Sequence, residues 1–98
     1  MTEKLKFERG SGNVFIDIGF GKAEAENLKM RSDLMICITR FYRKSGLTQA
    51  AAAKVLGLTQ PRLNALLKGK IGLFSLDALV TVASKAGLSV RLVVKKVA

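Results

Sequence analysis

The apolar residues in the middle of the chain recur with helical spacing. Those of residues 34–42 stand at i, i+1, i+4, i+7 and i+8, which places them on one face of a helix. Ser32 and Asp33 can cap this helix, and Gly46 stands where a left-handed residue commonly ends one. Residues 22–30 are rich in helix formers and carry glutamates near their start. They predict a separate, shorter helix.

Three further helices are predicted from their boundary residues. Each follows a Ser or Thr that can accept a hydrogen bond from a first-turn N–H, and each precedes a glycine. Two of them are separated by a three-residue turn, the arrangement of a helix-turn-helix. The caps and helices are Thr48 with Gln49–Leu56, Thr59 with Gln60–Leu67, which has Pro61 in its first turn, and Ser75 with residues 76–86; the glycines are Gly57, Gly69 and Gly87.

Apolar and polar residues alternate near both ends of the chain. The alternation over residues 14–20 and 88–97 predicts extended segments. Residues 1–13 end in a turn-rich stretch and predict a flexible arm. We therefore expect an N-terminal arm with a short extended segment over residues 1–21, and one domain over residues 22–98. Because a lone terminal strand must pair, we expect it to pair with residues 14–18 or with the same strand of a second protomer.

The charge is strongly basic and unevenly distributed. Seventeen Lys and Arg residues face seven Asp and Glu residues, a net charge of +10, and six of the seven acids lie in the first third of the chain. Every charged residue between Asp33 and Asp77 is basic. This pattern predicts a polyanionic partner, the alternative being a surplus of lysine that only maintains solubility.

The composition excludes most familiar enzyme chemistry. The chain has no histidine and one cysteine, so it cannot form a Ser-His-Asp or Cys-His catalytic set or a Cys/His zinc site. We expect no catalytic residue, cofactor or metal, and we expect Cys37 to be packed inside a helix. A charged N-terminus and the absence of long apolar runs predict a cytoplasmic protein without a membrane span.

Residues 47–70, LTQAAAAKVLGLTQPRLNALLKGK, contain the candidate functional residues. Burial of the leucines of the second helix leaves polar side chains that can read base edges or hold phosphates. The predicted base-reading residues are Gln60, Arg62 and Asn64. The predicted phosphate-binding residues are Arg43, Gln49, Thr59, Lys68 and Lys70.

This stretch resembles the lambda-repressor-like, Xre-type family of DNA-binding domains, with its Leu-Thr-Gln, small-residue run, Leu-Gly and Lys-Gly-Lys. The resemblance implies a mainly α bundle of about five helices with a C-terminal β-strand. It also implies that Gln49 holds a phosphate and supports Gln60. Pro61 and Leu67 depart from residues common in the family, so no base preference is carried over.

The flanking segments are similar to those of small HigA-type antitoxins. The resemblance implies a homodimeric repressor that binds a double-stranded operator, autorepresses its operon and neutralises a ribonuclease-type toxin. The main alternative is a standalone or phage-type regulator of the same family without a toxin. Two further alternatives are an antitoxin that acts by protein contact alone and a protein that coats RNA or DNA through charge alone.

Overall fold

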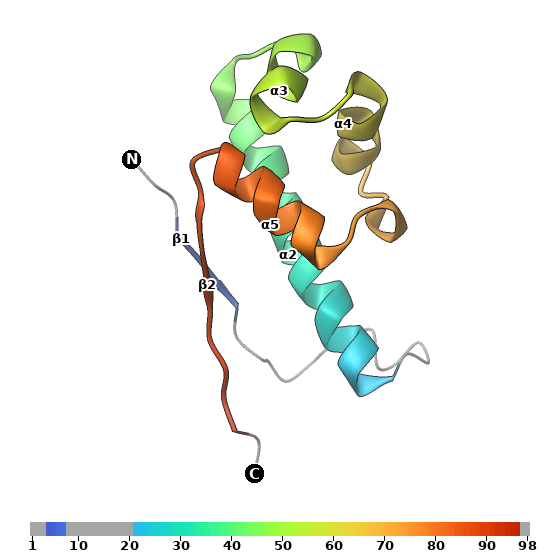
Figure 1. Ribbon diagram of the computed structural model, residues 1–98, viewed down its shortest axis with the longest axis vertical. Helices are drawn as coiled ribbons and strands as arrows, with labels where there is room; N and C mark the ends of the chain where they lie inside the picture. The colour runs from blue at the N-terminus through green and yellow to red at the C-terminus, as the bar shows by residue number, and fades with distance from the viewer. Residues whose placement is uncertain (1–3, 8–20, 97–98) are drawn as a thin grey trace.

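The computed structural model describes residues 4–7 and 21–96 of the 98-residue chain. Four α-helices form the body, and two short strands lie beside it (Figure 1). The elements are β1 (Lys4–Phe7), α2 (Lys22–Ser45), α3 (Gln49–Leu56), α4 (Gln60–Leu67), a 3-10 turn η1 (Ile71–Leu73), α5 (Leu76–Lys85) and β2 (Ser89–Leu92). The mainly helical class with a C-terminal strand is confirmed.

α2 is one continuous helix of 24 residues, so the prediction of a separate helix over residues 22–30 was wrong. Ser32 and Asp33 lie inside it, where each costs only a few tenths of a kcal/mol relative to better helix formers. Asp33 instead accepts from Lys29 one turn earlier, at 3.1 Å. Buried Ala25 and Leu28 extend the apolar face of the second half of α2 toward its start. Packing along this face outweighs the capping preference of the two polar residues.

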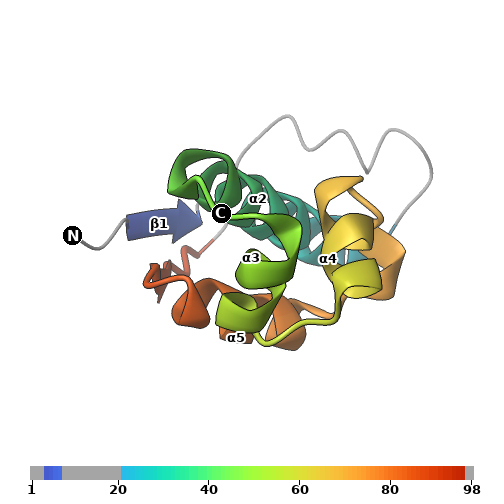
Figure 2. The same ribbon diagram turned by 90° about the horizontal axis from the view of Figure 1, so that it is seen from above.

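The three shorter helices begin at the predicted caps. The side-chain oxygens of Thr48, Thr59 and Ser75 accept from first-turn backbone N–H groups at 3.1, 3.3 and 3.1 Å. Seen from above, α3 and α4 lie side by side over one end of α2 and α5 (Figure 2). The helix-turn-helix predicted from caps and glycines is therefore confirmed.

The core lies where α2, α4 and α5 meet. Its largest fully buried side chains come from every helix and from the loop before α5: Leu34, Ile38, Leu56, Leu63, Leu66, Phe74 and Leu79. Cys37 is buried in the same cluster, as predicted. Phe41 and Tyr42 are partly buried against it.

The two strands correct the prediction for the chain ends. β2 covers only Ser89–Leu92 of the predicted 88–97, and its partner within the described chain is β1, in parallel register from Lys4 beside Ser89 to Phe7 beside Leu92. Residues 4–7 were expected to belong to a flexible arm. Their sequence, KLKF, alternates charged and apolar residues, a period-two pattern too short to stand out. The predicted extended segment at 14–20 lies outside the described residues.

Candidate nucleic-acid interface

The turn between α3 and α4 is held by backbone hydrogen bonds. Gly57 has a φ of +70°, a left-handed conformation that favours glycine. The next N–H, of Leu58, donates to the Ala53 carbonyl at 2.8 Å, which closes the end of α3. Buried Ala52 and Ala53 let α3 approach its neighbours closely. The relative position of the two helices is thus determined within a few residues of the turn.

α4 has a buried face and an exposed polar face. Leu63 and Leu66 are buried in the core, whereas Gln60, Asn64 and Lys68 are exposed at successive i, i+4 positions. Residues with this spacing lie above one another on one side of a helix. Two predicted base-reading residues, Gln60 and Asn64, therefore share the exposed face of α4 with a lysine at its end.

The third predicted base-reading residue, Arg62, contacts its own domain. Its Nη1 donates to the Leu73 carbonyl at 3.0 Å, and its guanidinium carbon lies 4.3 Å from the centre of the Phe74 ring. The side chain is exposed but turned toward the loop after α4. A base contact requires the guanidinium to leave both partners.

The starts of α3 and α4 can bind anions. Neither helix has an acidic residue in its first turn, so the partial positive charge of each N-terminus is not neutralised locally. Exposed Gln49 and Gln60 are the first residues of these helices, and within the described chain no hydrogen bond joins their side chains. The hydroxyl of Thr59 caps α4 as an acceptor, and a hydroxyl that accepts can still donate to a phosphate.

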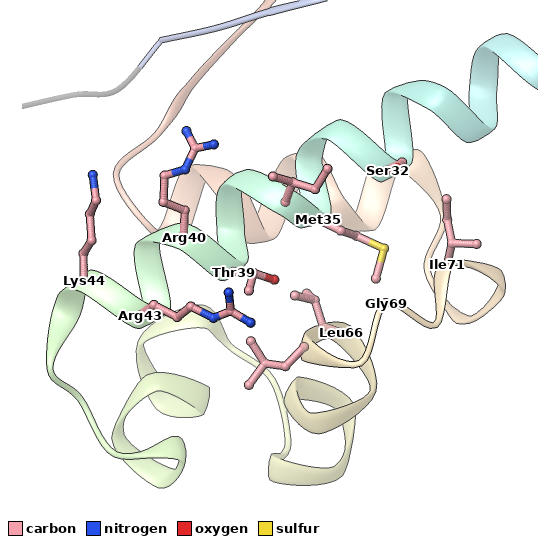
Figure 3. A pocket seen from close by; sticks show the side chains of 11 residues that line it. Ser32, Met35, Thr39, Arg40, Arg43, Lys44, Leu66, Gly69 and Ile71 are labelled. Atoms are coloured by element: carbon pink, nitrogen blue, oxygen red, sulfur yellow. The ribbon is translucent and has the colours of Figure 1, made fainter. Parts of the chain in front are cut away.

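Arg43 lies on α2, beside the helix-turn-helix. With Arg40 and Lys44 it lines one end of a groove of about 740 Å³ between α2 and the end of α4 (Figure 3). The rest of the lining is mainly apolar and carries no acid: Ser32, Met35, Ile36, Thr39, Leu66, Leu67, Gly69 and Ile71. The groove joins Arg43 to Gly69, which precedes Lys70. The other predicted phosphate-binding residues are Gln49 at the start of α3 and the two caps of α4, Thr59 and Lys68.

Arg31 helps to position the loop after α4, a role that the sequence did not predict. Its Nε donates to Asn27 Oδ1 at 2.7 Å, and its Nη1 donates to the carbonyls of Ile71 and Phe74, each at 3.2 Å. The loop after α4 is therefore held by two arginines, one on α2 and one on α4. No local pattern reveals its role, because the two carbonyls that it holds lie 40 and 43 residues further along the chain.

The described residues define a helix-turn-helix domain in which every charged residue between Asp33 and Asp77 is basic. The family model for the helix-turn-helix domain matches residues 14–95, so the chain belongs to that family. A solved structure named "Putative XRE Family Transcriptional Regulator" is 32% identical, with a TM-score of 0.69 over 74% of this chain and 82% of that chain. The chain is thus XRE-like in fold and in sequence. No curated protein matches it.

The described residues contain neither a helix that could span a membrane nor a cluster of metal ligands. No helix among them is long and apolar enough to cross a bilayer. No group of three or more His, Cys, Asp or Glu side chains among residues 4–7 and 21–96 is arranged to hold a metal ion.

Proposed function

We propose that the protein is a transcriptional repressor of the XRE type that binds double-stranded DNA in a sequence-specific manner. The observation that carries this proposal is the exposed polar row on α4, set in a segment whose charged residues are all basic. A helix with such a row fits the major groove, where amide side chains can bond base edges while cations and helix N-termini hold the backbone. A promoter occupied in this way is closed to transcription.

Gln60 and Asn64 are the proposed base-reading residues, and Arg62 can join them only after leaving Leu73 and Phe74. The phosphate-binding role is proposed for exposed side chains around α4: Arg43, Gln49, Thr59, Lys68 and Lys70.

The test is the salt dependence of binding to duplexes selected from a random library. If about 4 to 6 phosphates per protomer are neutralised, log affinity falls with log salt at a slope of roughly −0.9 per phosphate. Asn64→Ala should cost about 1 to 3 kcal/mol on a selected duplex and little on random DNA, whereas Lys70→Ala should weaken both alike. A slope near zero, or equal affinity for RNA and for every duplex, contradicts the proposal.

We further propose that the repressor is a homodimer. Leu92 and Val94 share one face of the extended chain and are 72% and 71% exposed. A second copy that pairs with this segment would cover them. Because β2 also holds β1, the test uses Leu92→Lys with Val94→Lys rather than a truncation. The variant should sediment as a monomer. If it stays dimeric while Leu73→Lys does not, the interface lies at the exposed loop before α5.

A second function, that of a HigA-type antitoxin, is favoured by the separation of charge. Six of the seven acids precede the basic segment, and a toxin that cleaves RNA needs a basic surface of its own. We propose that such a toxin docks on the N-terminal third, which holds six acids and six Lys or Arg residues and is neutral beside the basic remainder of the chain. The alternative is a standalone regulator whose acids only offset helix dipoles.

Co-expression of the chain with the toxin-sized product of a neighbouring gene separates these two readings. The charge variant Glu8→Gln, Asp17→Asn, Glu24→Gln leaves the residues of β1 and β2 unchanged. It should bind DNA as before and fail to rescue growth. Full rescue by this variant places the toxin elsewhere, and a neighbouring product that is not toxic favours the standalone regulator.

A further inference from the structure

The loop from Lys68 to Phe74 carries two of the proposed phosphate-binding lysines. Its first part is tied to α4, since the N–H groups of Gly69 and Lys70 donate to the carbonyls of Leu66 and Ala65 at 3.0 and 3.1 Å. Its second part is the single turn η1, which no side chain caps. Its backbone N–H groups bond only within the loop, from Ile71 to Gly69, from Leu73 to Lys70 and from Phe74 to Ile71, so they fix its shape but not its position against the helices.

Side chains from two helices supply what the turn lacks. Arg31 Nη1 donates to the carbonyls of Ile71 and Phe74, and Arg62 Nη1 donates to the carbonyl of Leu73. Hydrogen bonds from a charged donor are among the stronger ones in proteins. The two arginines thus bind three backbone carbonyls within four residues of the loop.

Each guanidinium is itself oriented. Arg31 is partly buried, and its Nε donates to Asn27 Oδ1 one turn earlier on α2. Arg62 lies over the ring of Phe74, which is 1% exposed and therefore fixed in the core. A planar, charged group over an aromatic face gains a cation–π attraction in addition to its hydrogen bond.

We propose that Arg31 and Arg62 are positioning residues of the DNA interface. They fix η1 and, through the bond from the Leu73 N–H to the Lys70 carbonyl, Lys70, so that this lysine meets the phosphate backbone without further ordering. The inference rests on the proposed DNA-binding function and assigns Arg62 a role other than reading a base. Interfaces that are ordered before binding lose less conformational entropy when they bind. Loosening the loop therefore weakens binding to every duplex rather than to one sequence.

Charge-conserving variants test the proposal. Arg31→Lys and Arg62→Lys keep the net charge but cannot reproduce the guanidinium geometry, and Arg91→Lys on β2 is the matched control. Affinity is measured for a duplex selected by the wild type and for random duplex over a range of salt. Each variant should weaken both by a similar factor, on the order of 5 to 10, and leave the salt slope unchanged, because the same phosphates are contacted once the loop has been ordered. Arg91→Lys should change neither.

Each part of the proposal is contradicted by a different result. A loss for Arg62→Lys on the selected duplex alone makes Arg62 a base-reading residue and overturns the proposal for it. Unchanged DNA affinity in Arg31→Lys, with lowered thermal stability, makes Arg31 structural only. If Arg31→Lys does not fold, Asn27→Ala is used instead, because it removes only the acceptor that orients Arg31. Asn27→Ala should weaken DNA binding in the same way but less. Unchanged DNA affinity in Asn27→Ala overturns the proposal for Arg31. If the wild-type protein binds DNA with no dependence on salt and no preference for the selected duplex, the proposed function itself is refuted.

Nuclear magnetic resonance provides a second measurement. The Nε–H resonance of Arg62 should be displaced upfield by the Phe74 ring, should lose this displacement in Phe74→Leu, and should keep it when the selected duplex is added. A large shift on adding the duplex means that the guanidinium leaves the ring for the DNA, which contradicts a positioning role.

Discussion

The two connections on either side of α4 are built in different ways. The turn from Gly57 to Thr59 is held by the backbone of α3 and by the cap of α4. The loop from Lys68 to Phe74 has a similar left-handed glycine, Gly69, but its later part depends on Arg31 and Arg62. A local turn fixes the angle between two helices, whereas the longer loop acquires its place only once α2 and α4 have packed.

Phe74→Ala should produce the largest effect, since it removes both a core ring and the surface under Arg62. Loss of a fully buried phenylalanine costs about 3 to 5 kcal/mol in the free energy of unfolding. Urea denaturation measures it, and Phe74→Leu, which keeps most of the apolar volume, should cost clearly less. If Phe74→Ala lowers the free energy of unfolding by less than Gly57→Ala in the turn before α4, the Phe74 ring does not anchor the loop after α4.

Gly57→Ala and Gly69→Ala should have nearly equal effects. Both glycines have φ near +70°, which costs an L-residue about 1 to 2 kcal/mol. An added Cβ at Gly57 would also lie 2.5 Å from Lys85 Nζ, but the end of that flexible side chain can move away. Thermal unfolding of the two variants, with Gly72→Ala as a control without positive φ, checks this. A much larger loss at Gly57 would show that Lys85 cannot move.

The caps of α4 and α5 should differ in DNA binding but not in stability. Thr59→Ala and Ser75→Ala each remove one cap hydrogen bond and should cost about 1 kcal/mol in unfolding free energy. Only Thr59→Ala should weaken DNA binding, because its hydroxyl is also a proposed phosphate ligand. Thr59→Ser should restore both properties. Equal DNA loss from Ser75→Ala would show that the arginines alone do not hold the loop.

Asp33→Asn should have the smallest effect. Its ion pair with Lys29 spans one turn of α2, and both side chains are about two-fifths exposed. Such pairs contribute about 0.3 to 0.5 kcal/mol and are screened by salt. Denaturation at low and high salt should show this small loss only at low salt, with no change in DNA affinity. A DNA effect as large as that of Arg31→Lys would mean that the register of α2, rather than Arg31, places the loop.

The sequence predicted what depends on neighbouring residues. Thr48, Thr59 and Ser75 were identified as caps because a cap acts on N–H groups two or three residues away. The division of α2 was wrong because Ser32 and Asp33 have the same local preference whether or not an apolar face continues past them. The exposed residues of α4 followed from its buried leucines.

Contacts between distant segments were not predictable from local patterns. Leu73, which accepts from Arg62, lies 11 residues beyond it, and the acceptors of Arg31 lie on a loop whose position depends on helix packing. The partner of β2 was missed for the same reason, because a four-residue strand shows its partner only in the folded chain. Base-reading and phosphate-binding roles remain predictions.

The parallel pairing of β1 with β2 has a consequence during synthesis on the ribosome. Residues 4–7 are made well before the strand that they pair with, which is completed only when Leu92 has been added. At about 5 to 20 residues per second, β1 waits on the order of ten seconds for its partner. α2, α3 and α4 are complete at Leu67 and can begin to pack during this interval, whereas α5 and β2 are made last and almost together.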